Sequence, residues 1–195
     1  MNKEIKRNVE MRAESFNEDE RSAEFVISTE ARDSYGTVFK MNGWDLNRYN
    51  NNPIVLFNHD ASDIDSVIGR SEVRIEDNKL IGKVYFENAD LNPLADKIYR
   101  KMQAGTIRGA SIRANIEDAR MGKGENEDPD TLYFTRQELM EWSVVTLNSN
   151  PDAVARNQKE IDEIRAEVKP EPKEEPKKEV RFDTYEAQLI INQNN

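Results

Sequence analysis

Three segments of this chain alternate between apolar and polar side chains, and this period of two constrains the fold more than any other feature. The segments are Ser66–Glu76 (SVIGRSEVRIE), Lys79–Glu87 (KLIGKVYFE) and Arg108–Asp118 (RGASIRANIED). Successive side chains of a β-strand point to opposite faces of a sheet, so alternation predicts strands with one buried face. Only Asp77 and Asn78 separate the first two segments, and such a short link favours a tight hairpin turn.

Further strands are expected where β-branched and aromatic residues gather. These segments are Ser22–Thr29 (SAEFVIST), Thr37–Met41 (TVFKM), Pro53–Phe57 (PIVLF), Leu132–Leu139 (LYFTRQEL) and Met140–Leu147 (MEWSVVTL). The segment Pro53–Phe57 is apolar throughout, which is consistent with a strand buried on both faces. In the last segment, Met140 is expected to share a face with Trp142 and Val144. The pattern predicts an α+β protein that is mainly β.

The clearest predicted helix lies between Asp90 and Gly105. Asn92 can cap its start and Pro93 suits its first turn, while Gly105 fits the position just beyond its end. Its apolar residues recur every four positions: Leu94, Ile98 and Met102. We expect this helix to cover one end or one face of the sheet.

Composition divides the chain into four parts. Hydrophobic residues make up 36% and charged residues 34% of the 195 residues, so we expect one folded domain and a part that does not fold compactly. The predicted parts are a charged arm (1–20), the folded domain (21–155), a charged helix (156–168) and a low-complexity linker with a tail (169–195). Within the last part, Lys169–Glu179 (KPEPKEEPKKE) cannot bury enough apolar area to offset its chain entropy, so we expect it to be disordered.

Charge and composition exclude several classes of protein. The formal net charge of −10 opposes nucleic-acid binding, in which Lys and Arg neutralise phosphates. The charged first residues lack the apolar centre of a secretory signal, and no apolar run approaches the roughly 20 residues that span a bilayer. The absence of cysteine fits a reducing compartment. We expect a soluble intracellular protein with neither a nucleic-acid nor a membrane partner.

The chain contains a single histidine, His59, at the end of the apolar segment Asn52–Asp60 (NPIVLFNHD). Any chemistry that needs an imidazole must therefore use this residue. A zinc site normally has three or four protein ligands, mostly imidazole or thiolate, and one histidine without cysteine does not supply them. A metallohydrolase is disfavoured, and we expect neither a metal nor another cofactor.

A serine nucleophile, His59 as its base and a carboxylate that orients the imidazole form the only complete set for covalent catalysis. Ser111 is one serine of several. In its alternating segment it shares a face with Arg113, away from the apolar side chains. The pattern alone therefore describes an exposed strand serine equally well.

Four motifs resemble those of the prohead maturation protease family of tailed bacteriophages. They are NPIVLFNHD, IGRSE, GTIRGASIRA and LMEWSVVTLNSNPDA, in this order, and DSYG with GWDL is similar to the family's opening. The resemblance covers about Ser22–Val154. It implies a serine endopeptidase similar in fold to herpesvirus assemblins, with a barrel-like antiparallel sheet of about seven strands and flanking helices.

The resemblance implies a general-base role for His59 and a nucleophile role for Ser111. For the third member we choose Glu141, because an acid in an otherwise apolar strand is costly to bury without a partner. Asp60 is the alternative, but adjacent residues of an extended segment point to opposite sides, so Asp60 is expected to hold the loop. Family members often have Gly-Phe where this chain has Arg113 and Ala114. Arg113 could bind the oxyanion or be an ordinary surface arginine.

The resemblance also implies partners and a place of action. Such enzymes cleave scaffold and major capsid precursors inside the assembling prohead, in the host cytoplasm, and commonly cleave themselves. Lys169–Glu179 would then be a self-cleavage or tethering region, and Val180–Ile191 (VRFDTYEAQLII) a docking segment. The sequence does not decide whether the protein forms a homo-oligomer. The alternative is a catalytically inert capsid-assembly or scaffold protein that retains the fold.

Overall fold

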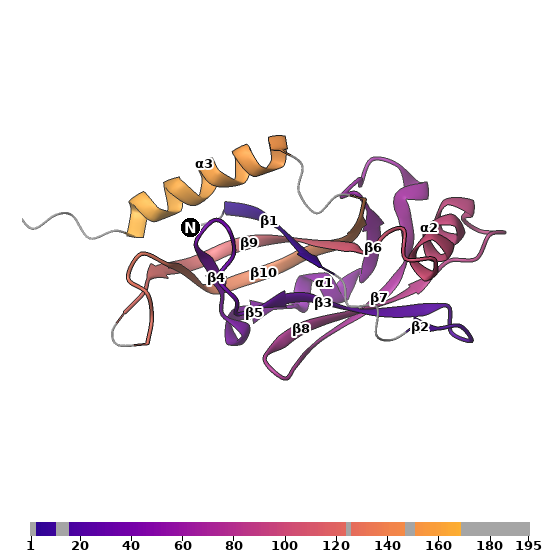
Figure 1. Cartoon of the computed structure of the whole chain (residues 1–195), viewed down its shortest axis with the longest axis horizontal. Coiled ribbons are helices and arrows are strands. Elements are labelled where there is room, and N and C mark those ends of the chain that lie inside the picture. Colours follow the sequence, from indigo (N-terminus) through magenta and orange to yellow (C-terminus); the bar gives the residue numbers. More distant parts are fainter. Residues whose placement is uncertain (1–2, 11–15, 124–125, 147–150, 169–195) are drawn as a thin grey trace, which may run out of the picture.

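The computed structural model describes residues 3–10, 16–123, 126–146 and 151–168. Within these residues a sheet of ten strands forms the centre of the molecule (Figure 1), with the order β1-β9-β10-β6-β7-β8-β3-β2 and with β4 and β5 also paired to β10. The strands are β1 (Lys3–Glu10), β2 (Phe16–Asn17), β3 (Ser22–Thr29), β4 (Thr37–Phe39), β5 (Trp44–Asp45), β6 (Ile54–Phe57), β7 (Val67–Glu76), β8 (Lys79–Phe86), β9 (Gly109–Met121) and β10 (Leu132–Val145). The α-helices are α1 (Asn47–Asn51), α2 (Pro93–Gln103) and α3 (Pro151–Val168), and the short 3-10 helices are η1 (Met41–Gly43) and η2 (Ile64–Ser66).

The local patterns are confirmed where a turn or a cap defines them. Asp77 and Asn78 join β7 to β8 with φ angles of 47° and 58°, the left-handed values that a tight hairpin turn requires. Asn92 caps α2, since its side-chain oxygen accepts hydrogen bonds from the backbone N–H groups of Leu94 and Ala95. Gly105 follows the helix with a φ of 71°.

The two last predicted strands are wrong as separate elements, because Leu132–Val145 forms the single strand β10. No glycine or proline interrupts this segment, and β-bulges absorb its irregularities instead of a turn. One bulge lies between Leu139 and Glu141 and leaves Met140 as an extra residue. Leu139 is therefore fully buried, whereas Met140, expected to share the core face with Trp142, is only half-buried.

The expected antiparallel barrel of seven strands is also wrong, because the sheet is mixed. β10 pairs antiparallel with β9 but parallel with β4, β5 and β6. The chain from Thr37 to Phe57 runs beside β10 in the same direction and pairs with it in three short pieces, between which η1 and α1 interrupt the ladder. Within the described residues the sheet does not close, since β1 ends it on one side and the two-residue β2 on the other.

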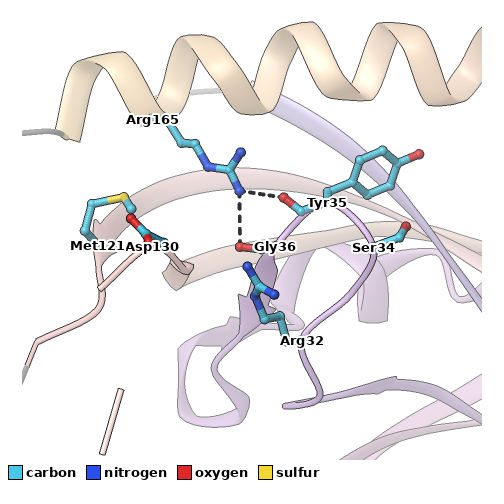
Figure 2. Close-up of a pocket in the computed structure, with 7 residues that line it drawn as sticks. All are labelled: Arg32, Ser34, Tyr35, Gly36, Met121, Asp130 and Arg165. Atoms are coloured by element: carbon cyan, nitrogen blue, oxygen red, sulfur yellow. Dashed lines mark hydrogen bonds between the residues drawn. The ribbon is translucent and has the colours of Figure 1, made fainter. Parts of the chain in front are cut away.

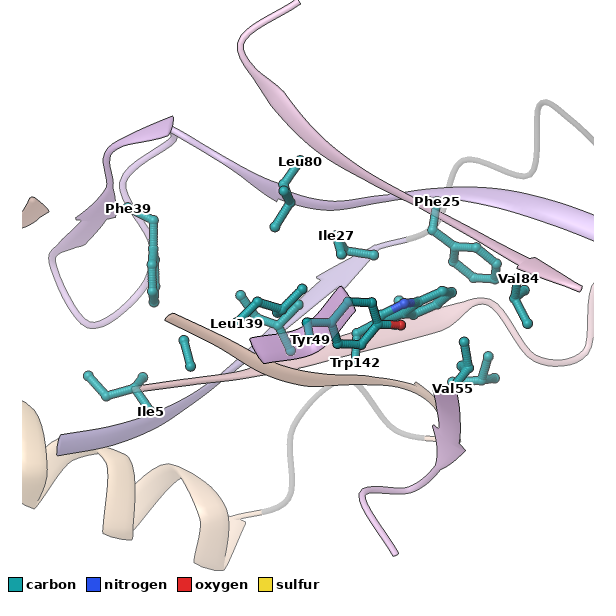
Figure 3. Close-up of a cluster of buried hydrophobic side chains, with 14 of the residues drawn as sticks. Ile5, Phe25, Ile27, Phe39, Tyr49, Val55, Leu80, Val84, Leu139 and Trp142 are labelled. Atoms are coloured by element: carbon teal, nitrogen blue, oxygen red, sulfur yellow. The ribbon is translucent and has the colours of Figure 1, made fainter. Parts of the chain in front are cut away.

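The core lies on the face of β9 and β10 that carries Ile112 and Trp142 (Figure 3). The indole of Trp142 contacts the ring of Phe25, with ring centroids 5.2 Å apart. α3 contacts β1 and β9 and buries Ile161 and Ile164 completely, while α2 contacts β7 and β8 (Figure 1). The core face of the central strand pair is thus covered, and functional side chains can gather only on its opposite face.

Two of the predicted charged parts contain secondary structure. The expected charged arm 1–20 contains β1 and β2, and the expected charged helix 156–168 is the larger part of α3. The tail 169–195, with its predicted cleavage and docking segments, lies outside the described residues. No helix in the described part of the chain is both long and apolar enough to cross a membrane.

Candidate active site

Ser111 lies in β9, with a strand paired on each side. Its partner in β10 is Ser143, and its partner in β1 is Asn8. Alternation turns its side chain to the face opposite Ile112 and the core. Ser111 has no exposed surface, so the alternative of a solvent-facing strand serine is wrong.

His59 lies in a turn that directly follows β6. Asn58 and His59 both have left-handed backbones, with φ angles of 55° and 60°, and the N–H of Asp60 donates to the carbonyl of Phe57 at 3.1 Å. This geometry is that of a type I′ turn, in which glycine usually takes one central position. A left-handed residue other than glycine costs about 1–3 kcal/mol, so other contacts must hold His59 in place.

Those contacts come from β10 and the residue that follows it. The N–H of Asn58 donates to the carbonyl of Val144 at 2.9 Å, and the N–H of Thr146 donates to the side-chain oxygen of Asn58 at 3.0 Å. The N–H of His59 donates to Ser143 Oγ at 3.2 Å. Asn58 and the backbone of His59 therefore both fix the turn against the end of β10.

The imidazole of His59 joins Ser111 to Glu141. His59 Nε2 lies 2.7 Å from Ser111 Oγ, and His59 Nδ1 lies 2.5 Å from Glu141 Oε1. An ionised carboxylate can only accept, so Nδ1 carries the hydrogen and Nε2 is free to accept from the serine hydroxyl. The three side chains are thus connected in the order that a nucleophile, its base and an orienting carboxylate require.

Glu141 is 8% exposed, and three neighbours compensate its burial. Besides the bond to His59, its Oε2 accepts from Ser143 Oγ at 2.8 Å, and its Oε1 lies 3.5 Å from Arg113 Nε. A buried carboxylate with hydrogen bonds and a cation nearby avoids most of the cost of desolvation. Arg113 Nε also lies 3.1 Å from Glu4 Oε1 of β1, so this guanidinium stands beside two carboxylates. Its contact with an oxyanion remains a prediction.

Asp60 lies outside this chain of hydrogen bonds. Its Oδ1 accepts from the hydroxyl and the N–H of Ser62, at 2.7 and 2.9 Å, and these bonds hold the pKa of Asp60 below its usual value. The structure therefore brings His59, Ser111 and Glu141 together and places Asp60 in the loop that follows.

Sequence reasoning missed Ser143 as part of the site. This serine is fully buried, donates to Glu141 and accepts from the N–H of His59, so it links the carboxylate to the turn that carries the imidazole. The available signal was alternation, which puts Glu141 and Ser143 on one face of their strand. The left-handed turn at Asn58 and His59 contains no glycine, the residue that marks such turns most clearly in a sequence.

A cavity of about 320 Å³ lies at the other end of the β9–β10 pair (Figure 2). Its lining residues are Arg32, Ser34, Tyr35, Gly36, Met121, Asp130 and Arg165. Arg165 donates to the carbonyls of Tyr35 and Gly36 and so ties α3 to the turn before β4. None of the three connected residues lines this cavity. Among the described residues, no group of His, Asp and Glu side chains could hold a metal ion.

Comparisons with known proteins identify a similar fold and a family. The fold is similar to that of the bacteriophage T4 capsid assembly protease gp21, with a TM-score of 0.55 and 13% sequence identity, over 74% of this chain and 97% of that chain. At such low identity the likeness concerns the fold alone. No curated protein sequence matches the chain at a significant level. The family model described as caudovirus prohead serine protease matches residues 17–167, well over half of the chain. The chain therefore belongs to the caudovirus prohead serine protease family.

Proposed function

We propose that this protein is a serine endopeptidase that cleaves scaffold and major capsid precursors inside the assembling prohead, within the host cytoplasm. The observation that carries the proposal is the hydrogen-bonded chain from the buried Ser111 through His59 to Glu141, in a member of this protease family. The relative of similar fold is a capsid assembly protease, which supports capsid proteins as the substrate class.

In the proposed mechanism, Ser111 Oγ attacks the carbonyl carbon of the scissile peptide bond while its proton passes to His59 Nε2. Glu141 stabilises the imidazolium that forms and keeps its orientation. The imidazolium then gives its proton to the leaving amine, and the C–N bond breaks to leave an acyl-serine. Water, deprotonated by His59, hydrolyses this ester and restores the serine hydroxyl.

The same proposal includes self-cleavage, with Lys169–Glu179 as the candidate segment because of its charged, low-complexity composition. An inert assembly protein is not favoured. All three side chains that such a protein could lose are present and hydrogen-bonded.

The test is co-expression with the cognate scaffold and major capsid proteins, followed by measurement of precursor cleavage. Ser111→Ala and His59→Ala should each lower the cleavage rate by at least about 10³-fold, because each removes a member of the reacting set. Ser28→Ala is the matched control, since Ser28 is also fully buried but its hydroxyl has no hydrogen-bond partner. Continued cleavage by Ser111→Ala would refute the nucleophile assignment.

A fluorophosphonate probe gives a second measurement without a protein substrate. It should label wild type and Ser28→Ala, and it should label neither Ser111→Ala nor His59→Ala. Labelling of Ser111→Ala at the wild-type rate would show that another serine is the nucleophile.

A further inference from the structure

The strand β1 lies along the edge of β9 that β10 leaves free (Figure 1). All eight residues of β1 pair antiparallel with β9, in a register that sets Asn8 opposite Ser111 and Glu10 opposite Gly109. The backbone of β1 therefore passes directly beside the proposed nucleophile. β9 has a partner strand on both edges.

The proposed nucleophile is closed off from solvent. Ser111 has no exposed surface, and the side chains of His59 and Glu141 are only 12% and 11% exposed. A scissile carbonyl must come within about 3–3.5 Å of Ser111 Oγ to react. Some element must therefore move before a peptide bond can reach the serine.

Of the strands beside Ser111, β1 is the one that can move without destroying the site. β10 carries Glu141 and Ser143, and β6 leads into the turn that carries His59. β1 is the end strand of the sheet, so its departure breaks a single ladder and leaves those hydrogen bonds in place. It also lies outside residues 17–167, the part of the chain that the family model matches.

Each of the three described side chains of β1 makes a contact that must break when the strand leaves. Ile5 is 3% exposed and packs in the core, whereas Lys3 forms ion pairs at 2.9 and 3.1 Å with Glu163 and Glu167 of α3, which are about half exposed. Such surface pairs contribute about 0–1 kcal/mol each. Glu4 pairs with Arg113, the cation that also stands beside Glu141. Release of β1 would therefore also free this guanidinium.

We propose that the edge of β9 from Gly109 to Ile116 is the docking edge for the substrate, and that β1 is an internal inhibitory strand that occupies it. This inference rests on the proposed protease function. The substrate would be an extended segment of a precursor protein that adds to the sheet as an antiparallel strand. Main-chain hydrogen bonds supply this kind of binding, so any extended peptide can replace those that β1 makes.

A disulfide that locks β1 onto β9 tests the proposal in the full chain. Glu4 and Asn115 are direct partners across the two strands, and paired positions in antiparallel strands have Cα distances of about 4.5–5.5 Å, within the range of a disulfide. The chain has no cysteine, so Glu4→Cys with Asn115→Cys forms one defined bond on oxidation. Mass spectrometry checks its formation, and failure to form would contradict the register and overturn the proposal.

The readout is the rate of fluorophosphonate labelling at Ser111. We expect the oxidised double variant to label at least 20-fold more slowly than the same protein after reduction. Glu4→Cys alone is the control, because oxidation cannot lock it within the molecule and its rate should not respond. Equal rates for the oxidised and reduced double variant would overturn the inhibitory role of β1.

Ile5→Asp tests the opposite direction, because it removes the buried apolar anchor of β1. Labelling should become at least fivefold faster, while far-UV circular dichroism reports whether the rest of the sheet is retained. A folded Ile5→Asp variant that labels no faster than wild type would also count against the proposal. If wild type, the reduced double variant and a folded Ile5→Asp variant all fail to label, the serine protease function itself fails. This result differs from equal labelling of the oxidised and reduced double variant, which counts against the role of β1 alone.

Discussion

The two ends of the β9–β10 pair hold a carboxylate in different ways. At the end near His59, Glu141 is buried and its closest partner is an imidazole that can gain and lose a proton. At the other end, Arg120 forms a bidentate ion pair with Glu127, with hydrogen bonds of 2.5 and 2.8 Å. The side chain of Glu127 is 22% exposed and that of Arg120 is 31% exposed. The Arg120 guanidinium and the Lys123 N–H lower the pKa of Glu127 to about 2.

The difference shows what separates the proposed reactive carboxylate site from a structural ion pair on the same pair of strands. Arginine stays protonated, so no proton can move between Arg120 and Glu127 at working pH. The imidazole beside Glu141 is also bonded to a hydroxyl, so a proton has a path from oxygen to nitrogen. Substitutions at one end that leave the other end intact test this distinction.

The largest effect in this comparison is expected for Glu141→Gln, measured as the rate of precursor cleavage. The neutral amide can favour the wrong imidazole tautomer and does not stabilise the imidazolium, so the rate should fall roughly 10³–10⁴-fold. Glu127→Gln is the matched control, with the same chemical change at the other end, and its cleavage rate should stay within about twofold of wild type. Similar losses in both variants would abolish the distinction between the two ends.

A smaller effect is expected for Ser143→Ala. This change leaves Glu141 without one hydrogen bond and the N–H of His59 without its acceptor, so cleavage should slow about tenfold and the free energy of unfolding should fall by about 1–3 kcal/mol. Ser28→Ala should leave cleavage unchanged and should not lower the free energy of unfolding, because the hydroxyl of Ser28 is buried without a partner and its removal ends a desolvation cost. Cleavage by Ser143→Ala at the wild-type rate would show that the turn of His59 needs no support from β10.

Asp60→Asn should lower cleavage by no more than about threefold. Asp60 holds the loop through Ser62 and does not contact the imidazole, so its loss resembles an ordinary surface change of about 0.5 kcal/mol. The rates of Asp60→Asn and Glu141→Gln should be compared in one assay. A greater loss for Asp60→Asn would reassign the third member of the site to Asp60.

The smallest effect on cleavage is expected for Glu127→Gln, which should change only the stability of the fold. Its folded pKa of about 2 lies below the unfolded value of about 4.3, so its pair with Arg120 stabilises the fold above pH 4 and is lost as the pH falls toward 2. The difference in melting temperature between wild type and Glu127→Gln should therefore be present at pH 6 and shrink below pH 4. A difference that does not change with pH would mean that ionisation of Glu127 is not its source.

Local features of the sequence were sufficient for several elements and for the one imidazole that a site could use. The bounds of β3 follow from its β-branched and aromatic residues, the hairpin at Asp77 and Asn78 from its short link, and the start of α2 from the cap at Asn92. Because His59 is the only histidine, no other imidazole could take part in the site. These features depend on residues a few positions apart.

Strand partners could not be predicted in this way, because pairing joins residues far apart in the chain. The parallel contacts of β10 with β4, β5 and β6 replaced the expected antiparallel barrel, and the bulge before Glu141 moved Leu139 instead of Met140 into the core. The family resemblance pointed to Ser111, and the apolar strand around Glu141 pointed to that acid. Neither showed that Ser111 is buried or that Ser143 links Glu141 to His59.

By itself the sequence determined that this protein is mainly β, that its imidazole chemistry has one possible centre, and that its motifs match one protease family. Only the tertiary structure decided which carboxylate meets His59, how the left-handed turn is held, and that β1 lies beside Ser111. The physical reason is the range of the interactions. Caps, turns and alternation act along the chain, whereas 52 positions separate His59 from Ser111 and 82 separate it from Glu141, so only the register of the sheet brings them within hydrogen-bonding distance.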